Sequence, residues 1–163
     1  FFFKRKEHGR KMKRILFVCT GNTCRSPMAE SLMRHMAEQA GLVVEVKSAG
    51  LAAAEGLSMS AHAQDVLQEK GIACEVFSKP FTKELADWAD WILTMTEGHK
   101  SHILVQYPQF AEKVHVLKQF ANGGEDAQSC DISDPFGGSL EEYKRCAEEI
   151  EDALAEVVNK LKE

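Results

Sequence analysis

The chain has 163 residues, of which 44% are hydrophobic and 28% are charged, and its formal net charge is −5. This length and composition are typical of one folded domain, and the acidic balance disfavours non-specific binding to nucleic acid. No uncharged apolar run approaches the roughly 18 residues of a membrane span, so we expect no membrane association and a cytoplasmic protein.

Residues 1–11 differ in character from the rest of the chain, because they hold five basic side chains and a single glutamate. Met12 stands directly before the first apolar run, and three phenylalanines are too few for a signal-peptide core. We predict that residues 1–11 are a tag or mobile leader, with a short docking tail as the alternative. Residues 12–163 are predicted to form a single domain, which we expect to be a monomer.

The first half of the chain alternates between strand and helix patterns. Four apolar residues lead to Cys19, a polar loop follows, and Pro27 suits a first helical position with Ser26 as the cap. The predicted elements are a strand ending at Cys19, a helix over 27–39 stopped by Gly41, a strand over 42–48, and helices over 60–70 and 82–89, the last capped by Thr82.

The second half continues the alternation. Its predicted elements are strands over 91–95 and 113–117, a helix over 96–106, a long loop over 120–135, and a closing helix over 139–161 in which Ser139 and Glu142 form a capping box. Four strands alternating with helices predict an α/β fold, a three-layer doubly wound sheet of four parallel strands with helices on both faces. Ligands bind such sheets at the carboxyl ends of the strands, where the loop after Cys19 lies.

The cysteines argue against a metal site and a disulfide framework. Their number is odd, none forms a C-x-x-C pair, and the six histidines do not cluster near them. We therefore expect no metal, a reducing compartment and at least one functional thiol. The five are Cys19, Cys24, Cys74, Cys130 and Cys146.

The loop CTGNTCRS at 19–26 combines a thiol with an arginine beside the start of a helix. Backbone N–H groups of a curled loop bind phosphoryl oxygens, and Gly21 and Asn22 both tolerate the positive φ that a curl needs. The planar fork of Arg25 can hold two oxygens, which leaves Cys19 under the phosphorus for in-line attack. Ser26 can donate a hydrogen bond to the thiolate. The alternative is a plain strand–helix turn with a buried cysteine.

This loop resembles the phosphate-binding loop of the low-molecular-weight protein tyrosine phosphatase family. The similarity extends over nearly all of residues 13–161, including SAG at 48–50 and DP at 134–135. The resemblance implies Cys19 as nucleophile, Arg25 as phosphate and transition-state binder, and Asp134 as general acid, without a cofactor. It further implies that the loop Thr20, Gly21, Asn22, Thr23, Cys24, Arg25 and Ser26 binds the substrate, and that Asn22, Ser26 and Ser48 hold the loop in shape.

A carboxyl in a loop over the site could protonate the leaving group and then serve as base for water. Asp134, fixed by Pro135, suits this role, although D-P-x-G-G is also a good turn sequence. Asp131 is the nearby competitor, and it lacks the proline.

Two departures from the tyrosine phosphatases concern the substrate. Thr23 stands where those enzymes usually carry a branched aliphatic residue, and Phe136 is followed by glycines rather than by further aromatic residues. The combination is most similar to the bacterial protein-arginine phosphatases of the same family. This resemblance implies that Thr23 favours phosphoarginine, with Phe136 as the remaining aromatic wall and arginine-phosphorylated proteins as substrates. The alternative is that Thr23 only supports the loop through hydrogen bonds.

Cys24 lies in the same loop as Cys19, and the resemblance implies a reversible disulfide that protects the nucleophile; the alternative is that Cys24 packs inward. Three rival functions remain. One is a tyrosine phosphatase with the same mechanism. An arsenate reductase would need further cysteines, and residues 82–89 contain none. A phosphoprotein-binding module without activity would be expected to lose the thiol or the acid.

Overall fold

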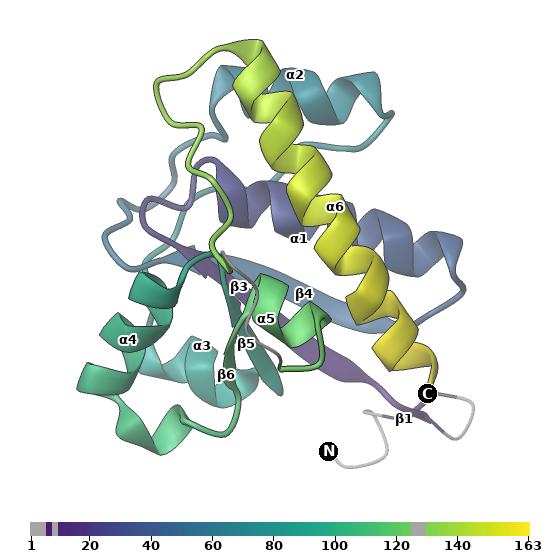
Figure 1. The fold of residues 1–163 in the computed structure, drawn as a ribbon, viewed down its shortest axis with the longest axis vertical. Coiled ribbons are helices and arrows are strands. Elements are labelled where there is room, and N and C mark those ends of the chain that lie inside the picture. Colours follow the sequence, from purple (N-terminus) through teal and green to yellow (C-terminus); the bar gives the residue numbers. More distant parts are fainter. Residues whose placement is uncertain (1–5, 8–9, 125–129) are drawn as a thin grey trace.

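A four-stranded parallel sheet forms the centre of the computed structural model, which describes residues 6–7, 10–124 and 130–163 (Figure 1). The strand order is β4-β3-β5-β6, so the chain passes from β3 to one neighbour and then returns to the other side. This order confirms the predicted doubly wound sheet. The strands are β3 (Lys13–Cys19), β4 (Val44–Gly50), β5 (Trp91–Thr94) and β6 (Val114–Val116).

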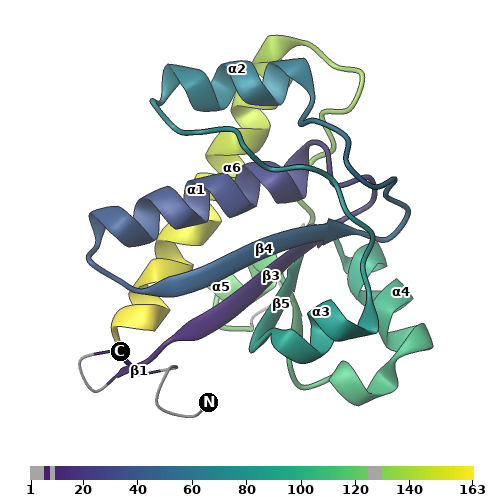
Figure 2. The same ribbon diagram turned by 180° about the vertical axis from the view of Figure 1, so that it is seen from behind.

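Helices cover both faces of this sheet (Figures 1 and 2). One face carries α1 (Arg25–Gln39), α5 (Leu117–Ala121) and α6 (Leu140–Lys162), with α2 (Ala61–Glu69) packed against α1 and α6. The other face carries α3 (Lys83–Trp88), α4 (Glu97–Gln106) and the short 3-10 helix η2 (Pro108–Phe110). No helix in the described parts of the chain is both long and apolar enough to cross a membrane.

The alternation of side chains along β3 divides the core between the two faces. Ile15, Phe17 and Cys19 pack with α1 and α6, whereas Leu16 and Val18 pack with α3 and α4. A central parallel strand is buried on both faces, which explains why its sequence is a continuous apolar run rather than an alternating one. Cys19 therefore stands at the carboxyl end of the most buried strand of the sheet.

The N-terminal segment is described only in part. The strands β1 (Lys6–Glu7) and β2 (Arg10–Lys11) form a small antiparallel pair separate from the main sheet. Residues 1–5 and 8–9 lie outside the described residues. The tag or mobile leader over 1–11 and the single domain over 12–163 therefore stay predictions.

Most predicted helix ends are confirmed, and one cap is wrong. Thr82 accepts a hydrogen bond from the N–H of Leu85, and Ser139 forms the predicted capping box with Glu142. The first helix, however, begins at Arg25 with Cys24 as its cap residue, so Ser26 lies inside the helix. The hydroxyl of Ser26 is engaged with the thiol of Cys19 instead of a helix N–H.

Two further boundaries differ from the sequence prediction. The second strand runs over Val44–Gly50 rather than 42–48, because Gly41 takes a positive φ and the chain needs two more residues to enter the sheet. The predicted loop over 120–135 begins inside α5, and residues 125–129 of it lie outside the described residues.

Candidate active site

The loop between β3 and α1 curls back on itself at the carboxyl end of the sheet. Asn22 provides the curl with φ of +57°, whereas Gly21 does not use the positive φ that both residues tolerate. The end of β4 supports the loop closely, because a Cβ at Gly50 would lie 2.5 Å from the carbonyl oxygen of Thr20. Only glycine allows this approach of the two backbones.

The thiol of Cys19 is buried and faces hydrogen-bonding groups of its own loop. Its Sγ lies 2.8 Å from Oγ of Ser26, and it accepts a hydrogen bond from the backbone N–H of Asn22 at 3.3 Å. Both contacts stabilise a negative charge on sulfur, as does the start of α1. The geometry therefore suits a nucleophilic thiolate.

Arg25, at the other end of the loop that begins at Cys19, contacts the segment that holds Asp134. Nη1 of Arg25 donates to the carbonyl oxygen of Ile132 at 3.1 Å, and Nη2 lies 3.6 Å from Oδ2 of Asp134. The other carboxylate oxygen of Asp134 accepts from the N–H of Phe136. The backbone N–H of Ile132 in turn donates to Met95 at the end of β5, so this segment is tied to the sheet.

Asp131 and Phe136 occupy other positions. Oδ1 of Asp131 accepts a hydrogen bond from the N–H of Glu97 at 2.8 Å, at the start of α4. This contact gives the carboxylate a capping function for that helix. The side chain of Phe136 is 77% exposed, so it is not part of a closed aromatic wall.

Cys24 faces away from the loop, toward α2 and α6. Its Sγ lies 3.3 Å from Oη of Tyr143 and 3.5 Å from Oγ of Ser60. Burial, and then the hydrogen bond with Cys24, raise the pKa of Tyr143. The carbonyl of Thr23 accepts from the N–H of Ser60, and Cys19 and Cys24 are both free thiols. Oγ1 of Thr23 lies 3.9 Å from Sγ of Cys24.

His99 contacts the phosphate loop, although no motif in the sequence selects it. Its Nε2 lies 3.0 Å from Oγ1 of Thr20, and the ring is buried against the loop. Burial, followed by the charge of Arg25, lowers the pKa of His99 from 6.5 to about 4, so the imidazole is neutral at physiological pH. The other ring nitrogen, Nδ1, has no hydrogen-bond partner among the residues that the structure describes.

The predicted support residues lie together behind the loop. Nδ2 of Asn22 donates to Ser26 at 2.8 Å and to Ser48 at 3.0 Å. Ser48 donates in turn to the carboxylate of Glu30, a residue that the sequence analysis missed. Its only signal in the sequence is an acidic residue one helical turn after Ser26, which places both on the same face of α1.

The fold and this loop define a class of protein. A thiol at the end of a central parallel strand, a curled loop opening a helix, an arginine fork and a facing carboxylate are the parts of a cysteine-dependent phosphatase. Among the described residues, no group of three or more His, Cys, Asp or Glu is arranged to hold a metal ion.

Comparison with known proteins specifies the family. The family model for low molecular weight phosphotyrosine protein phosphatase matches residues 14–163. A protein-arginine-phosphatase from Geobacillus stearothermophilus is 48% identical over 91% of this chain and 95% of its own length. One from Bacillus subtilis is 45% identical, covering 91% and 96%. The chain belongs to the low molecular weight phosphotyrosine protein phosphatase family.

A solved structure resembles the whole architecture. It is a Cys-to-Ser mutant of the YwlE arginine phosphatase with a phosphorylated active-site serine. It superposes with a TM-score of 0.86 at 43% identity and covers 92% of this chain and 96% of its own. In that protein the replaced cysteine position accepts the phosphoryl group, so the likeness is consistent with covalent catalysis.

Proposed function

We propose that this protein is a protein-arginine phosphatase that hydrolyses phosphoarginine in proteins through a phosphocysteine intermediate. One observation carries the proposal: the buried thiol of Cys19 is held by Ser26 and Asn22, and Arg25, at the other end of the same loop, pairs with Asp134. We assign these residues the roles of nucleophile, phosphate binder and proton donor. The relatives named as protein-arginine-phosphatases, at 45% and 48% identity, support the choice of substrate.

In the first step Sγ of Cys19, as a thiolate, attacks phosphorus in line with the leaving nitrogen. An S–P bond forms while the P–N bond of phosphoarginine breaks, and the electron pair of that bond stays on the arginine nitrogen. Asp134 in its protonated form gives this nitrogen a proton. Arg25 and the loop N–H groups stabilise the negative charge on the transferring oxygens.

In the second step water attacks the phosphorus of the phosphocysteine. Asp134, now a carboxylate, takes a proton from that water. The S–P bond breaks, its electron pair returns to Cys19, and inorganic phosphate is released. The hydrogen bond from Ser26 stabilises the departing thiolate, which is the same contact that favours the nucleophile in the first step.

The proposed preference for phosphoarginine depends on Thr23. Its partly buried side chain lies in the phosphate loop and offers a hydroxyl where an aliphatic residue would offer only methyl groups. A hydroxyl can orient water or contact the planar, nitrogen-rich leaving group. Phe136 is the aromatic residue we assign to the entrance, where it can stack on the guanidinium.

A tyrosine phosphatase with the same mechanism is the second candidate. The family name and a relative described as a low molecular weight protein-tyrosine-phosphatase from Staphylococcus haemolyticus, 38% identical, favour it. The chemistry at sulfur would not change. Only the leaving group would differ.

We also propose the setting in which the enzyme acts. Free thiols and an acidic net charge support a monomeric enzyme of the cytoplasm, acting on arginine-phosphorylated proteins without nucleic acid. We further propose that Cys24 is a redox partner for Cys19. The two thiols share one loop, and both are reduced in this structure.

The deciding experiment compares kcat/KM on two peptides of identical sequence, one with phosphoarginine and one with phosphotyrosine. We expect at least about tenfold higher kcat/KM for phosphoarginine, equivalent to about 1.4 kcal/mol of transition-state stabilisation. A preference for phosphotyrosine would assign the second candidate function. No turnover of either peptide would contradict catalysis itself.

A further inference from the structure

A continuous chain of hydrogen bonds leads from the thiol of Cys19 to a buried carboxylate. Oγ of Ser26 lies 2.8 Å from the thiol and accepts from Asn22, which also donates to Ser48. Oγ of Ser48 donates to Oε1 of Glu30 at 2.7 Å. The second oxygen of Glu30 accepts from Nη2 of Arg34 at 2.6 Å, one turn further along α1.

Glu30 determines the direction of the hydrogen bond at Ser48, and thereby leaves Ser48 as an acceptor for Asn22. A carboxylate can only accept, so the hydroxyl of Ser48 must donate to it. Oγ of Ser48 is then free to accept from Nδ2 of Asn22, and the other hydrogen of that amide donates to Ser26.

The amide of Asn22 cannot reverse without loss. Its Oδ1 accepts a hydrogen bond from the backbone N–H of Lys79 at 3.0 Å, which keeps Nδ2 toward the two serines. The hydroxyl hydrogen of Ser26 then has two acceptors, Sγ of Cys19 at 2.8 Å and the carbonyl of Ala49 at 3.5 Å. The shorter contact directs it to the sulfur.

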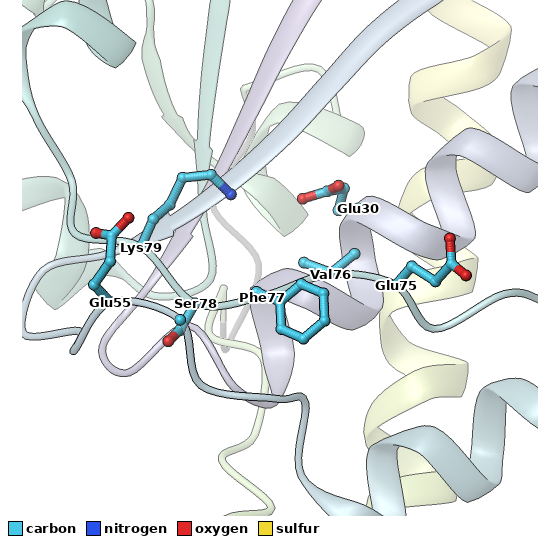
Figure 3. A pocket seen from close by; sticks show the side chains of 8 residues that line it. Glu30, Glu55, Glu75, Val76, Phe77, Ser78 and Lys79 are labelled. Atoms are coloured by element: carbon cyan, nitrogen blue, oxygen red, sulfur yellow. The ribbon is translucent and has the colours of Figure 1, made fainter.

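The carboxylate is costly to bury, which indicates a use beyond packing. Glu30 is 6% exposed, and an ionised carboxylate in such a place must be compensated by charges and hydrogen bonds. Arg34 provides one cation within ion-pair distance, and Lys79 lies across a pocket of ≈ 330 Å³ that it lines together with Glu30. Figure 3 shows the ammonium of Lys79 and the carboxylate of Glu30 pointing toward one another, with Glu55 and Glu75 further out.

We propose that Glu30 is a positioning residue for the reaction, acting through Ser48, Asn22 and Ser26 to keep a hydrogen bond donated to the sulfur of Cys19. This inference rests on the proposed use of Cys19 as the nucleophile. Glutamine at position 30 keeps the size and can still accept, but its amide can also donate to Ser48. The hydrogen of Ser48 then needs another acceptor, and Asn22 can provide one by turning its Oδ1 away from the N–H of Lys79 toward the two serines. Ser26 then donates to that oxygen and no longer to the thiolate.

The test compares Glu30→Gln with two controls of the same chemical change. Glu55→Gln removes a charge from the same pocket, and Glu38→Gln removes an exposed charge from the same helix. We expect E30Q to lower kcat about tenfold to hundredfold and to move the acidic limb of the kcat/KM profile to higher pH. Both controls should keep the wild-type profile.

A double variant separates positioning from general destabilisation. In a Ser26→Ala background the chain no longer reaches the sulfur, so E30Q should cost no further activity. A full additional loss in that background, or a shifted profile in E55Q as well, would overturn the proposal. The thermal midpoint of each variant, measured alongside, shows whether it is folded under assay conditions.

The role of Glu30 can also be tested without any substrate, so that the result does not depend on whether phosphoarginine is the substrate. The rate of alkylation of Cys19 by iodoacetamide at slightly acid pH, followed by peptide mass spectrometry, reports the thiolate directly. We expect a slower rate in E30Q than in E55Q or E38Q. Equal rates would refute the role of Glu30 even if phosphoarginine proved not to be the substrate.

Discussion

Nη2 of Arg25 and Oδ2 of Asp134 lie 3.6 Å apart, although the two residues come from opposite ends of the chain. The guanidinium is almost completely buried, whereas the carboxylate is 56% exposed. The arginine is therefore held in place by the fold and the aspartate is open to solvent, which suits the roles of phosphate binder and general acid that we propose for them.

Asp134→Asn should slow catalysis strongly without preventing phosphate binding. The amide cannot give a proton to the leaving nitrogen or take one from water, so we expect kcat to fall by about 10²- to 10⁴-fold. Asp131→Asn is the matched control, because that carboxylate is engaged by the N–H of Glu97. Steady-state kinetics on the phosphoarginine peptide measure both. An equal loss in the two variants would contradict the assignment of Asp134.

Cys19→Ser should abolish turnover and keep the phosphate loop intact. A serine hydroxyl is not ionised as readily as a thiol, so kcat should fall by at least about four orders of magnitude. Inorganic phosphate should still bind with an affinity close to that of the wild type, as measured by calorimetry. Cys74→Ser, remote from the loop, serves as the control. Substantial turnover in C19S would exclude the phosphocysteine pathway.

Thr23→Ile should move the preference away from phosphoarginine. The change replaces a hydroxyl by apolar surface, and a difference of this kind is worth about 10- to 200-fold in the ratio of kcat/KM values. Thr23→Ser keeps the hydroxyl and should retain the wild-type ratio on the two matched peptides. If T23I left the ratio unchanged, Thr23 would be a support of the loop only.

Peroxide should join Cys19 and Cys24 in a disulfide, so that both lose free-thiol reactivity together. Dithiothreitol should restore the reactivity of both. Sγ of Cys24 must first leave its contacts with Tyr143 and Ser60. In Cys24→Ser we expect Cys19 to oxidise irreversibly, because no second thiol intercepts the sulfenic acid. Cys146 is an internal reference, since burial raises the pKa of its thiol to about 12. If thiol mapping showed that Cys19 and Cys24 lose their free-thiol reactivity independently of one another, a disulfide between them would be excluded.

His99 should make the fold less stable in acid. Its pKa is about 4 in the folded protein and 6.5 when unfolded, so the unfolded state binds more protons between these values. As pH falls from 6.5 to 4, this site should remove up to about 3 kcal/mol of unfolding free energy.

Urea unfolding at several pH values measures this loss. His99→Gln cannot titrate and can still donate to Thr20, so it should lose this part of the pH dependence. His102→Gln, a change at an exposed neighbour, should keep it. Parallel curves for the wild type and H99Q would contradict the expectation.

The features that the sequence determined are those set by near neighbours in the chain. The apolar run before Cys19, the caps at Thr82 and Ser139, and the order of strands and helices depend on local patterns, and all are confirmed. Predictions failed where a tertiary contact competed with a local preference. Ser26 is a good cap residue by type, yet its hydroxyl faces the thiol of Cys19.

Only the tertiary structure decided which distant groups share the site. His99 on α4 reaches Thr20, Tyr143 on α6 reaches Cys24, and Glu30 reaches Ser48 across the face of β4. These contacts depend on which strands are neighbours and on how each helix packs, and no spacing along the chain encodes that. The sequence by itself determined the loop, its nucleophile candidate and the family resemblance. The tertiary structure decides whether Ser26 donates a hydrogen bond to the sulfur of Cys19. In our proposal this direction depends on the buried carboxylate of Glu30, which contacts the loop only through Ser48 and Asn22.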